Sequence, residues 1–365
     1  MIGAEVIQHN LLVLHTGGTI GMRPGPRGFA PSQGALLKTI AGTPQLHDPA
    51  VGVGERGGRP LFTTPPFAAG VRVRYEVLEY APLLDSANLE LSHWARLAED
   101  LGRLHDHYDG FVVLHGTDTM VFTASALSFM LEGFAKPVVL TGAQIPLGRL
   151  RNDALGNLLG AIEIAALHPI PEVTLFFHHR LLRGNRARKH DASSLDAFDS
   201  PNLPPLATVG IHVQLNDALI LPADPRPLRV RTELSPHVGS LRLYPGITGA
   251  VLENLLRPPL EGLVLETYGA GNGPERADLL ALLREASTRG VLILNVTQCS
   301  RGHVRGDYQA GRALAEAGVI AGGDLTSEAA MAKLALVLGQ RACSGWTRDV
   351  QVRLLQTPLR GEMSG

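Results

Sequence analysis

The chain has 365 residues, a length that predicts two domains at about 100–200 residues each. Its 33 Lys and Arg residues nearly balance its 34 Asp and Glu residues, so the basic face of a nucleic-acid-binding protein is not expected. Hydrophobic residues make up 45% of the chain and charged residues 18%, which provides a large core and excludes a disordered chain.

The cysteine count and the N-terminus favour a cytoplasmic protein. The two cysteines, Cys299 and Cys343, are too few for a disulfide scaffold or a cysteine-based metal site. Residues 1–10 lack the basic and apolar segments of a secretory signal, and no run reaches the roughly 20 apolar residues of a membrane span. We therefore expect a cytoplasmic location, with no membrane and no nucleic acid among the partners.

The first part of the chain alternates short apolar runs with helical patterns. Three continuous apolar runs, typical of buried parallel strands, lead into turns rich in Gly and Thr at residues 11–14, 111–114 and 138–140. Helices are predicted at 91–104 and 123–134, and further strands at 173–177 and 208–213. Strands that alternate with helices predict βαβ units and a parallel sheet.

A second α/β pattern follows a proline-rich segment. Residues 221–240 contain four prolines and no sustained apolar period, which indicates a linker. Strands are then predicted at 241–244, 263–267, 291–296 and 319–320, helices at 247–256, 276–289, 308–317 and 327–338, and a further element at 349–355. The sequence thus predicts an N-terminal α/β catalytic domain over 1–220, a linker over 221–240 and a C-terminal Rossmann-like domain over 241–365.

Polar residues gather where the N-terminal strands end, and ligands of open α/β sheets bind at such strand ends. Thr19, Thr117 and Asp118 lie in these turns beside glycines that let the backbone approach a ligand. This predicts a small polar site for a carbonyl or carboxylate. Each residue also has a structural explanation: Thr19 as a helix cap, Asp118 as a turn residue, and Lys189 as a solvated lysine in a polar loop. The first turn, at 16–22, matches neither a Walker loop nor G-x-G-x-x-G, and His178-His179 has no Cys or carboxylate partner at a metal-ligand spacing.

Taken together, these turns resemble the motifs of the bacterial-type asparaginase family. T-G-G-T-I-G-M at 16–22 is similar to the first family signature, and H-G-T-D-T-M at 115–120 to the second. Further similar motifs lie at T-G-A-Q (141–144), Lys189 with F-D-S-P-N (198–202), Y-G-A-G-N (268–272) and T-Q-C (297–299). With L-R-G-E at 359–362, the pattern resembles the cytoplasmic type I branch most.

The resemblance implies hydrolysis of L-asparagine to L-aspartate and ammonia. It also implies the asparaginase/glutaminase fold, in which a larger N-terminal parallel-sheet domain precedes a smaller Rossmann-like C-terminal domain. Thr19 would be the nucleophile that forms an acyl-enzyme. Thr117, Asp118 and Lys189 would form a second catalytic group, in which Lys189 withdraws a proton from Thr117. No metal and no organic cofactor is implied.

Substrate contacts and assembly are implied as well. Asp118 would also bind the substrate α-ammonium, Ser86 the α-carboxylate, and backbone N–H groups near Thr117 and Ala143 the oxyanion. Active sites of the family are completed by the C-terminal domain of a neighbouring subunit. Asn272 would therefore line the neighbour's site, in a homodimer or a dimer of dimers.

Two residues depart from the family pattern. The mobile lid of the family carries a tyrosine that contacts the nucleophile, and Phe29 stands where that tyrosine is expected. Phenylalanine lacks the hydroxyl that would relay a proton, so we expect Phe29 to slow turnover. Some type I members bind a second asparagine through an arginine and the T-Q-C cysteine. Cys299 is present here, but Glu266 stands at the arginine position, so no activation by asparagine is expected.

Two other functions remain open from the sequence. A catalytically weak asparagine-binding or sensor protein is suggested by Phe29, although such a protein would not need a Lys–Thr pair. An amidotransferase subunit that releases ammonia for tRNA amidation is a related alternative, although that branch usually carries an extra N-terminal domain. A glutaminase differs from an asparaginase by discrimination of one methylene, which is worth only about 1–3 kcal/mol. Ammonia release from each amide separates these possibilities.

Overall fold

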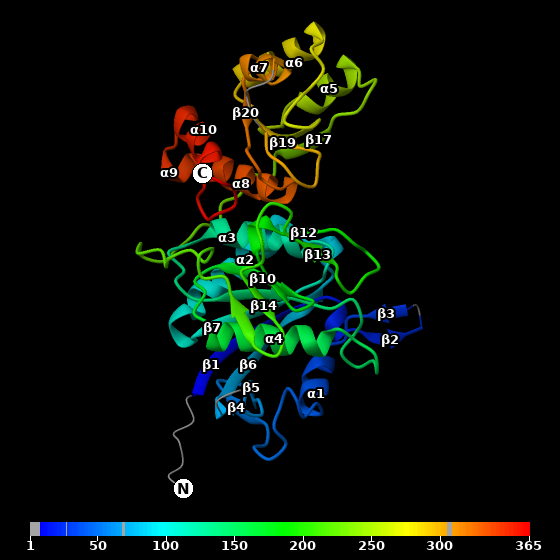
Figure 1. Cartoon of the computed structure of the whole chain (residues 1–365), viewed down its shortest axis with the longest axis vertical. Coiled ribbons are helices and arrows are strands. Elements are labelled where there is room, and N and C mark those ends of the chain that lie inside the picture. The colour runs from blue at the N-terminus through cyan, green and yellow to red at the C-terminus, as the bar shows by residue number, and fades with distance from the viewer. Residues whose placement is uncertain (1–7, 27, 68–69, 305–308) are drawn as a thin grey trace.

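The computed structural model describes residues 8–26, 28–67, 70–304 and 309–365, which form two α/β domains stacked along the long axis of the molecule (Figure 1). The larger domain contains a ten-stranded sheet. In spatial order, its strands are β15 (Val213–Leu215), β14 (Ala207–Val209), β11 (Arg180–Arg183), β10 (Val173–Phe177), β9 (Val138–Thr141), β7 (Gly110–Leu114), β1 (Gln8–Gly17), β6 (Arg72–Leu84), β5 (Arg59–Thr63) and β4 (Gly54–Arg56).

The strand directions correct the expectation of a parallel sheet. The central strands β10, β9, β7, β1 and β6 run parallel to one another, and the apolar runs predicted the first four of them. The strands beyond them on both edges pair antiparallel, so the sheet as a whole is mixed. Most successive strands at these edges are joined by short connections, which allow antiparallel but not parallel pairing. The α/β fold with a larger N-terminal and a smaller C-terminal domain is confirmed.

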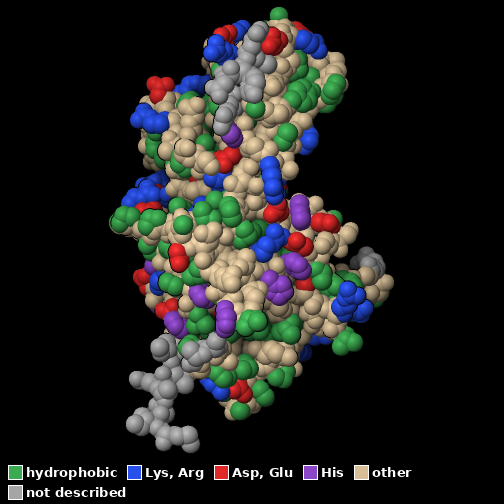
Figure 2. Space-filling view, viewed as in Figure 1, with side chains coloured by type: hydrophobic (Ala, Val, Ile, Leu, Met, Phe, Trp, Pro, Cys, Tyr) green, Lys and Arg blue, Asp and Glu red, His purple; other side chains and the backbone are tan. Residues whose placement is uncertain are grey.

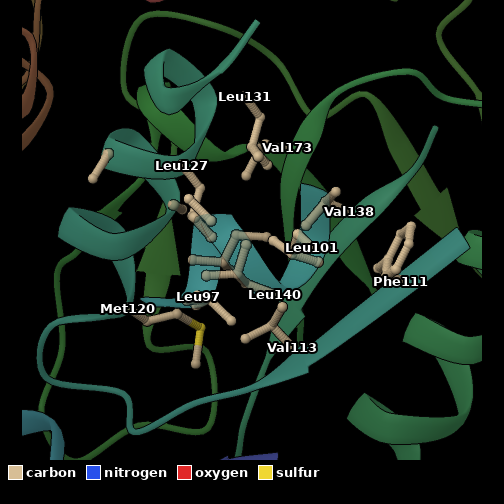
Figure 3. Packing of buried hydrophobic residues seen from close by; sticks show 14 of the residues in the cluster. Leu97, Leu101, Phe111, Val113, Met120, Leu127, Leu131, Val138, Leu140 and Val173 are labelled. Atoms are coloured by element: carbon tan, nitrogen blue, oxygen red, sulfur yellow. The ribbon is translucent and has the colours of Figure 1, made fainter. Parts of the chain in front are cut away.

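Helices cover both faces of the large sheet. Alternate residues of a strand point to opposite faces, so Leu12 and Leu14 of β1 join a core with α2 (Leu91–Leu104) and α3 (Met120–Met130). Figure 3 shows this core, with Leu97 and Leu101 facing side chains of β7 and β9. Leu11 and Val13 point the other way, to a core with α1 (Ala35–Ala41) and α4 (Ala154–Leu167).

The smaller domain has a four-stranded parallel sheet. Its strands follow the order β17 (Val238–Arg242), β18 (Gly262–Thr267), β19 (Leu292–Thr297) and β20 (Val319–Ala321). The connecting helices are α5 (Gly249–Leu256), α6 (Ala277–Thr288) and α7 (Gln309–Glu316). The chain ends with α8 (Ser327–Gly339), α9 (Arg341–Ser344) and α10 (Arg348–Gln356). Helix α8 lies between the two domains and packs against both α3 and β18 (Figure 1).

Several predicted elements have different bounds in the structure. The strand expected at 208–213 is two strands, β14 and β15, joined by a turn in which Val209 faces Val213. The strand expected at 241–244 lies earlier, because β17 ends at Arg242. Helix α3 ends at Met130 rather than 134, since β8 (Leu131–Glu132) pairs there with β16 (Arg229–Val230). Residue 308 of the helix predicted at 308–317 lies outside the described residues.

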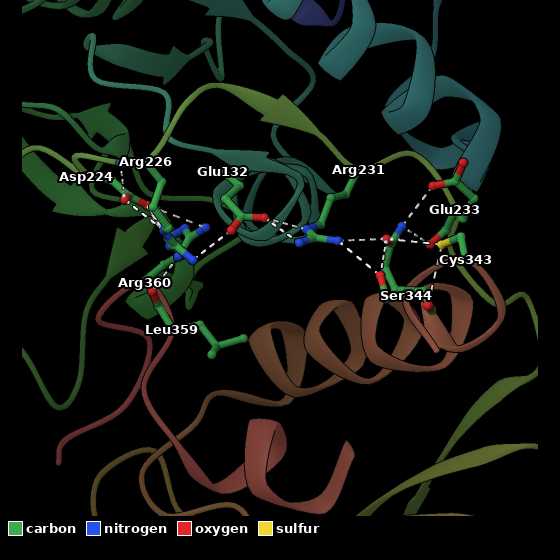
Figure 4. Close-up of polar contacts among 10 residues, drawn as sticks. Glu132, Asp224, Arg226, Arg231, Glu233, Cys343, Ser344, Leu359 and Arg360 are labelled. Atoms are coloured by element: carbon green, nitrogen blue, oxygen red, sulfur yellow. Dashed lines mark hydrogen bonds and ion pairs between the residues drawn. The ribbon is translucent and has the colours of Figure 1, made fainter. Parts of the chain in front are cut away.

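Polar contacts hold the predicted linker and the C-terminal tail against both domains (Figure 4). Glu132 of the larger domain accepts hydrogen bonds from Arg226 at 2.7 Å and Arg231 at 2.6 Å, and both arginines belong to residues 221–240. Arg231 also donates to Gln340 in the smaller domain. Arg186 and Asp324 form a buried ion pair of 2.6 Å directly between the domains.

The surface is mixed in charge. On the face shown in Figure 2, Lys and Arg side chains alternate with Asp and Glu side chains over both domains. Within the part of the chain that the structure describes, no helix combines the length and the apolar character that a membrane span requires.

Candidate active site

The predicted nucleophile lies at the end of β1. Gly17 and Gly18 take positive φ angles of 143° and 86°, and the chain then turns into a short 3-10 helix that begins at Thr19. The turn is tight against its neighbour: a Cβ atom placed on Gly18 would lie 2.5 Å from the backbone N of Gly116. The first and second strand-end turns are therefore in direct contact.

The second turn follows β7 and carries Thr117 and Asp118. The hairpin of β12 (Arg188–Lys189) and β13 (Phe198–Asp199) brings Lys189 to them across 72 residues of sequence. Lys189 Nζ lies 2.9 Å from Thr117 Oγ1 and 2.8 Å from Asp118 Oδ1. Thr117 is buried, whereas the Asp118 side chain is 66% exposed and available to a ligand.

The hydrogen bonds of Lys189 and Thr117 run in one direction through the site. Lys189 donates to Thr117, and the Thr117 hydroxyl in turn donates to Gln144 Oε1 at 3.2 Å. An ammonium group has donors and no lone pair. Lys189 can therefore take a proton from Thr117 only in its neutral form, after the hydrogen bond between them has reversed.

Ser86 approaches the same turn from the end of β6. Ser86 begins a 3-10 helix that Asp85 caps, since the Asp85 side chain accepts a hydrogen bond from the N–H of Ala87. Thr119 Oγ1 donates to the Ser86 carbonyl at 2.9 Å. A Cβ atom on Gly116 would collide with Ser86 Oγ, so this hydroxyl lies directly against the second turn.

The third turn, after β9, contains Ala143 and Gln144. Ala143 is buried, and Asp153 accepts hydrogen bonds from the backbone N–H groups of Gln144 and Ile145. The Gln144 amide reaches from Thr117 to the carbonyl of Ser194 in the loop after Lys189. Gln144 and Asp153 are site residues to which sequence reasoning gave no role, although the T-G-A-Q motif contained the first of them.

Two of the predicted site residues lie apart from this cluster. Asn272 belongs to the smaller domain, where its backbone pairs with Tyr268 and its buried Oδ1 has no partner among the described residues. Phe29 lies on β3 (Gly28–Ala30) of a hairpin with β2 (Arg23–Gly25), is 48% exposed, and places its ring 5.8 Å from the Arg149 guanidinium. The described contacts thus bring Thr117, Asp118 and Lys189 together, with the Thr19 and Ser86 turns against them.

Comparisons with known proteins agree with this architecture. Residues 10–221 match the family described as "Asparaginase, N-terminal", and residues 237–345 match the "Glutaminase/Asparaginase C-terminal domain". L-asparaginase 1 of Escherichia coli K12 is 44% identical over 97% of this chain and 98% of its own length. The solved L-asparaginase I of Vibrio cholerae has a TM-score of 0.84 and 41% identity, and the match covers 98% of this chain and 100% of that one.

Longer animal proteins are also similar. The 60 kDa lysophospholipases of Mus musculus and Homo sapiens are 47% and 48% identical over 98% of this chain. The chain spans 63% and 62% of their lengths, respectively.

The fold and the site together define a two-domain α/β protein with a threonine- and lysine-bearing site at the strand ends of its larger domain. The matches to both domain families and to relatives above 40% identity make the assignment specific. The chain belongs to the asparaginase family.

Proposed function

We propose that this chain hydrolyses L-asparagine to L-aspartate and ammonia. The observation that carries the proposal is the hydrogen-bonded group of Lys189, Thr117 and Asp118 at strand ends, with the Thr19 turn packed against it. A threonine hydroxyl is a weak nucleophile and requires a positioned base, which this group supplies. Its short polar side chains also suit a small zwitterionic substrate.

The reaction would proceed in two steps. Thr19 Oγ attacks the side-chain carboxamide carbon, its proton passes to the leaving nitrogen, and ammonia departs as the C–N bond breaks. Water then attacks the Thr19 ester and loses its proton through Thr117 to neutral Lys189. The ester C–O bond breaks, the Thr19 oxygen takes that proton back from Lys189 through Thr117, and aspartate leaves. N–H groups near Thr117 and Ala143 stabilise the tetrahedral oxyanion in both steps.

Substrate binding would use the exposed and the buried parts of the cluster. Asp118 holds the α-ammonium with a carboxylate that is open to solvent on one side. Ser86 binds the α-carboxylate through its hydroxyl, which is buried against Gly116. These side chains supply a nucleophile, a base and donors, so the proposed reaction includes neither metal nor cofactor.

Assembly and location are part of the proposal. We propose a homodimer or dimer of dimers in which Asn272 lines a neighbour's site. Asn272 Oδ1 is buried without a hydrogen-bond partner among the described residues, and its unused acceptor supports a role for this side chain beyond its own fold. A cytoplasmic location is supported by the two exposed free thiols, Cys299 and Cys343, which reducing compartments preserve. We also propose that the N-terminal domain ends at residue 220 and that the C-terminal domain begins at residue 241.

The deciding experiment is ammonia release from L-asparagine, L-glutamine and D-asparagine by the purified protein. We expect turnover of L-asparagine above that of the other amides, reduced at least ~10³-fold in Thr19→Ala. Lysophosphatidylcholine is included as a substrate because of the similarity to the animal lysophospholipases. Binding of asparagine without ammonia release would instead favour a sensor, and equal use of glutamine a broader amidohydrolase.

A further inference from the structure

Three side chains form a continuous chain of hydrogen bonds behind the second turn. Trp94 on α2 donates its indole Nε1–H to Thr123 Oγ1 of α3 at 2.9 Å. Thr123 Oγ1 lies 2.9 Å from Nε2 of His115, and His115 Nδ1 lies 2.7 Å from the carbonyl oxygen of Gly116. His115 is 2% exposed and Thr123 0%, so bulk water does not compete for these contacts.

Elementary chemistry fixes the direction of every bond in this chain. A carbonyl oxygen only accepts, so His115 Nδ1 carries a hydrogen. Burial lowers the pKa of His115 to about 4, which leaves the ring neutral at pH 7 with a single N–H. His115 Nε2 must then accept from the Thr123 hydroxyl, whose oxygen accepts from Trp94. Each polar atom is satisfied in one arrangement only.

The last bond of the chain acts on the peptide between Gly116 and Thr117. In a planar trans peptide the C=O and N–H groups point in opposite directions. His115 holds the Gly116 carbonyl toward the core, so the N–H of Thr117 points away from the core. Gly116, the residue that begins this peptide, lies against Gly18 of the first turn and against the Ser86 hydroxyl.

We propose that Trp94, Thr123 and His115 are positioning residues that aim the backbone N–H of Thr117 at the oxyanion of the tetrahedral intermediate. None of the three side chains needs to touch the substrate, because all act through the Gly116–Thr117 peptide. This inference rests on the proposed amidohydrolase function and assigns a role to residues outside the nucleophile and base.

A pair of substitutions at one position separates positioning from packing. Thr123→Val keeps the size and shape of the side chain but removes the donor to His115 and the acceptor for Trp94. Thr123→Ser keeps both hydrogen bonds and removes a methyl group. Because the oxyanion is absent from the bound substrate and develops only as the nucleophile attacks, Thr123→Val should lower kcat by ~10–100-fold with KM changed less than about threefold. Thr123→Ser should stay within about threefold of the wild-type kcat.

A measurement that does not need activity tests the hydrogen-bond chain itself. In protein labelled with ¹⁵N-histidine, and with His115→Asn used for assignment, the His115 signals should show a protonated Nδ1 and a bare Nε2 at pH 7. Thr123→Val should shift protonation toward Nε2, and Thr123→Ser should not. Trp94→Phe removes only the outermost bond, so its kcat should fall less than that of Thr123→Val.

The kinetic and the NMR experiments can each contradict the proposal independently. Wild-type kcat in a folded Thr123→Val protein, or a loss shared equally by Thr123→Ser, would overturn the positioning role. A proton found on Nε2 of wild-type His115 would overturn the bond directions and the proposal with them. If the wild-type protein releases no ammonia from any amide while His115 carries its proton on Nδ1, the proposed function fails and the oxyanion role fails with it, whereas the hydrogen-bond chain stands.

Discussion

At the scale of single residues, His115 makes the chain sensitive to acid. Burial lowers the pKa of His115 from 6.5 to about 4 in the folded protein. As the pH falls, the unfolded chain takes up the His115 proton at a higher pH than the folded protein does. The contribution of neutral His115 to the free energy of unfolding is therefore full above pH 6.5 and is lost as the pH falls toward 4. The contribution of this one group is at most about 3 kcal/mol. Urea unfolding at pH 7 and pH 4.5 should show a smaller loss of stability in His115→Asn than in wild type.

Phe29 is a second residue with a measurable consequence. Its ring is half exposed on the β2–β3 hairpin and lies near Arg149. Restoring a hydroxyl with Phe29→Tyr should raise kcat for L-asparagine by about tenfold, because a positioned acid–base group adds to the rate. Phe29→Leu serves as the control that removes the ring without adding a hydroxyl. Unchanged kcat in Phe29→Tyr would mean that the lid hydroxyl is dispensable in this protein.

The positions of the site residues in the sequence explain which of them could be predicted to lie together. Thr19, Thr117 and Asp118 were expected together because each follows a buried strand of one sheet. Their proximity to Lys189 followed only from family resemblance, since nothing local in the sequence reveals the short β12–β13 hairpin that delivers it. His115 was visible within the H-G-T-D-T motif, but its partners Thr123 and Trp94 come from two helices and had no sequence signal.

At the scale of secondary-structure elements, the contact between the first two turns limits which residues are tolerated at position 18 in place of Gly18. Its φ angle of 86° and its closeness to Gly116 both disfavour a side chain. Gly18→Ala should destabilise the fold by about 1–3 kcal/mol from backbone strain and reduce kcat, since the Thr19 turn must move.

A matched control exists for this substitution. Gly290 has a φ angle of 108°, and a Cβ atom there would meet nothing within 4 Å. Gly290→Ala should therefore lower the melting temperature through strain alone and leave kcat unchanged. Equal effects of the two variants on kcat would show that the contact between the turns is not needed for turnover.

The elements that sequence reasoning found and missed differ in a physical way. The strand at 173–177 was predicted with the bounds of β10, because a short apolar run between turns is unambiguous. Helix α4 was missed because it is buried along most of its surface and lacks a polar face. Strand β6 was missed as well, because it contains Glu76 and a charged residue is typical of an exposed segment. In the structure, Glu76 is buried and paired with Arg56 and Arg59.

At the scale of the whole molecule, we predict that this protein binds no second asparagine at the site that some type I members use. Glu266 stands where those members have an arginine, and its carboxylate lies 3.5 Å from Arg242 and 3.4 Å from Ser240 Oγ. An anion there repels a substrate carboxylate. Saturation by L-asparagine should therefore be hyperbolic, with a Hill coefficient near one. Clearly sigmoidal kinetics of the wild-type protein would show that a second asparagine binds elsewhere.

The C-terminal tail carries a fully buried ion pair. Lys333 of α8 and Glu362 of the tail are both 0% exposed and lie 2.6 Å apart. Glu362 also accepts hydrogen bonds from the backbone N–H groups of Leu359 and Arg360. Glu362→Gln would leave Lys333 charged without a counter-ion, which typically costs about 3–5 kcal/mol. Thermal unfolding of this variant against the exposed Glu253→Gln control measures the difference.

The position of that tail has a consequence for how the molecule unfolds. Ser364 donates to Asp324, and Asp324 pairs with Arg186, so the last residues connect the smaller domain to the larger one. Gly361 and Arg360 accept from Arg186 and Asn185 of the larger domain. Unfolding of either domain would break the Arg186–Asp324 ion pair and these hydrogen bonds. Calorimetry should therefore record one cooperative transition for both domains, and Asp324→Asn should begin to divide it into two.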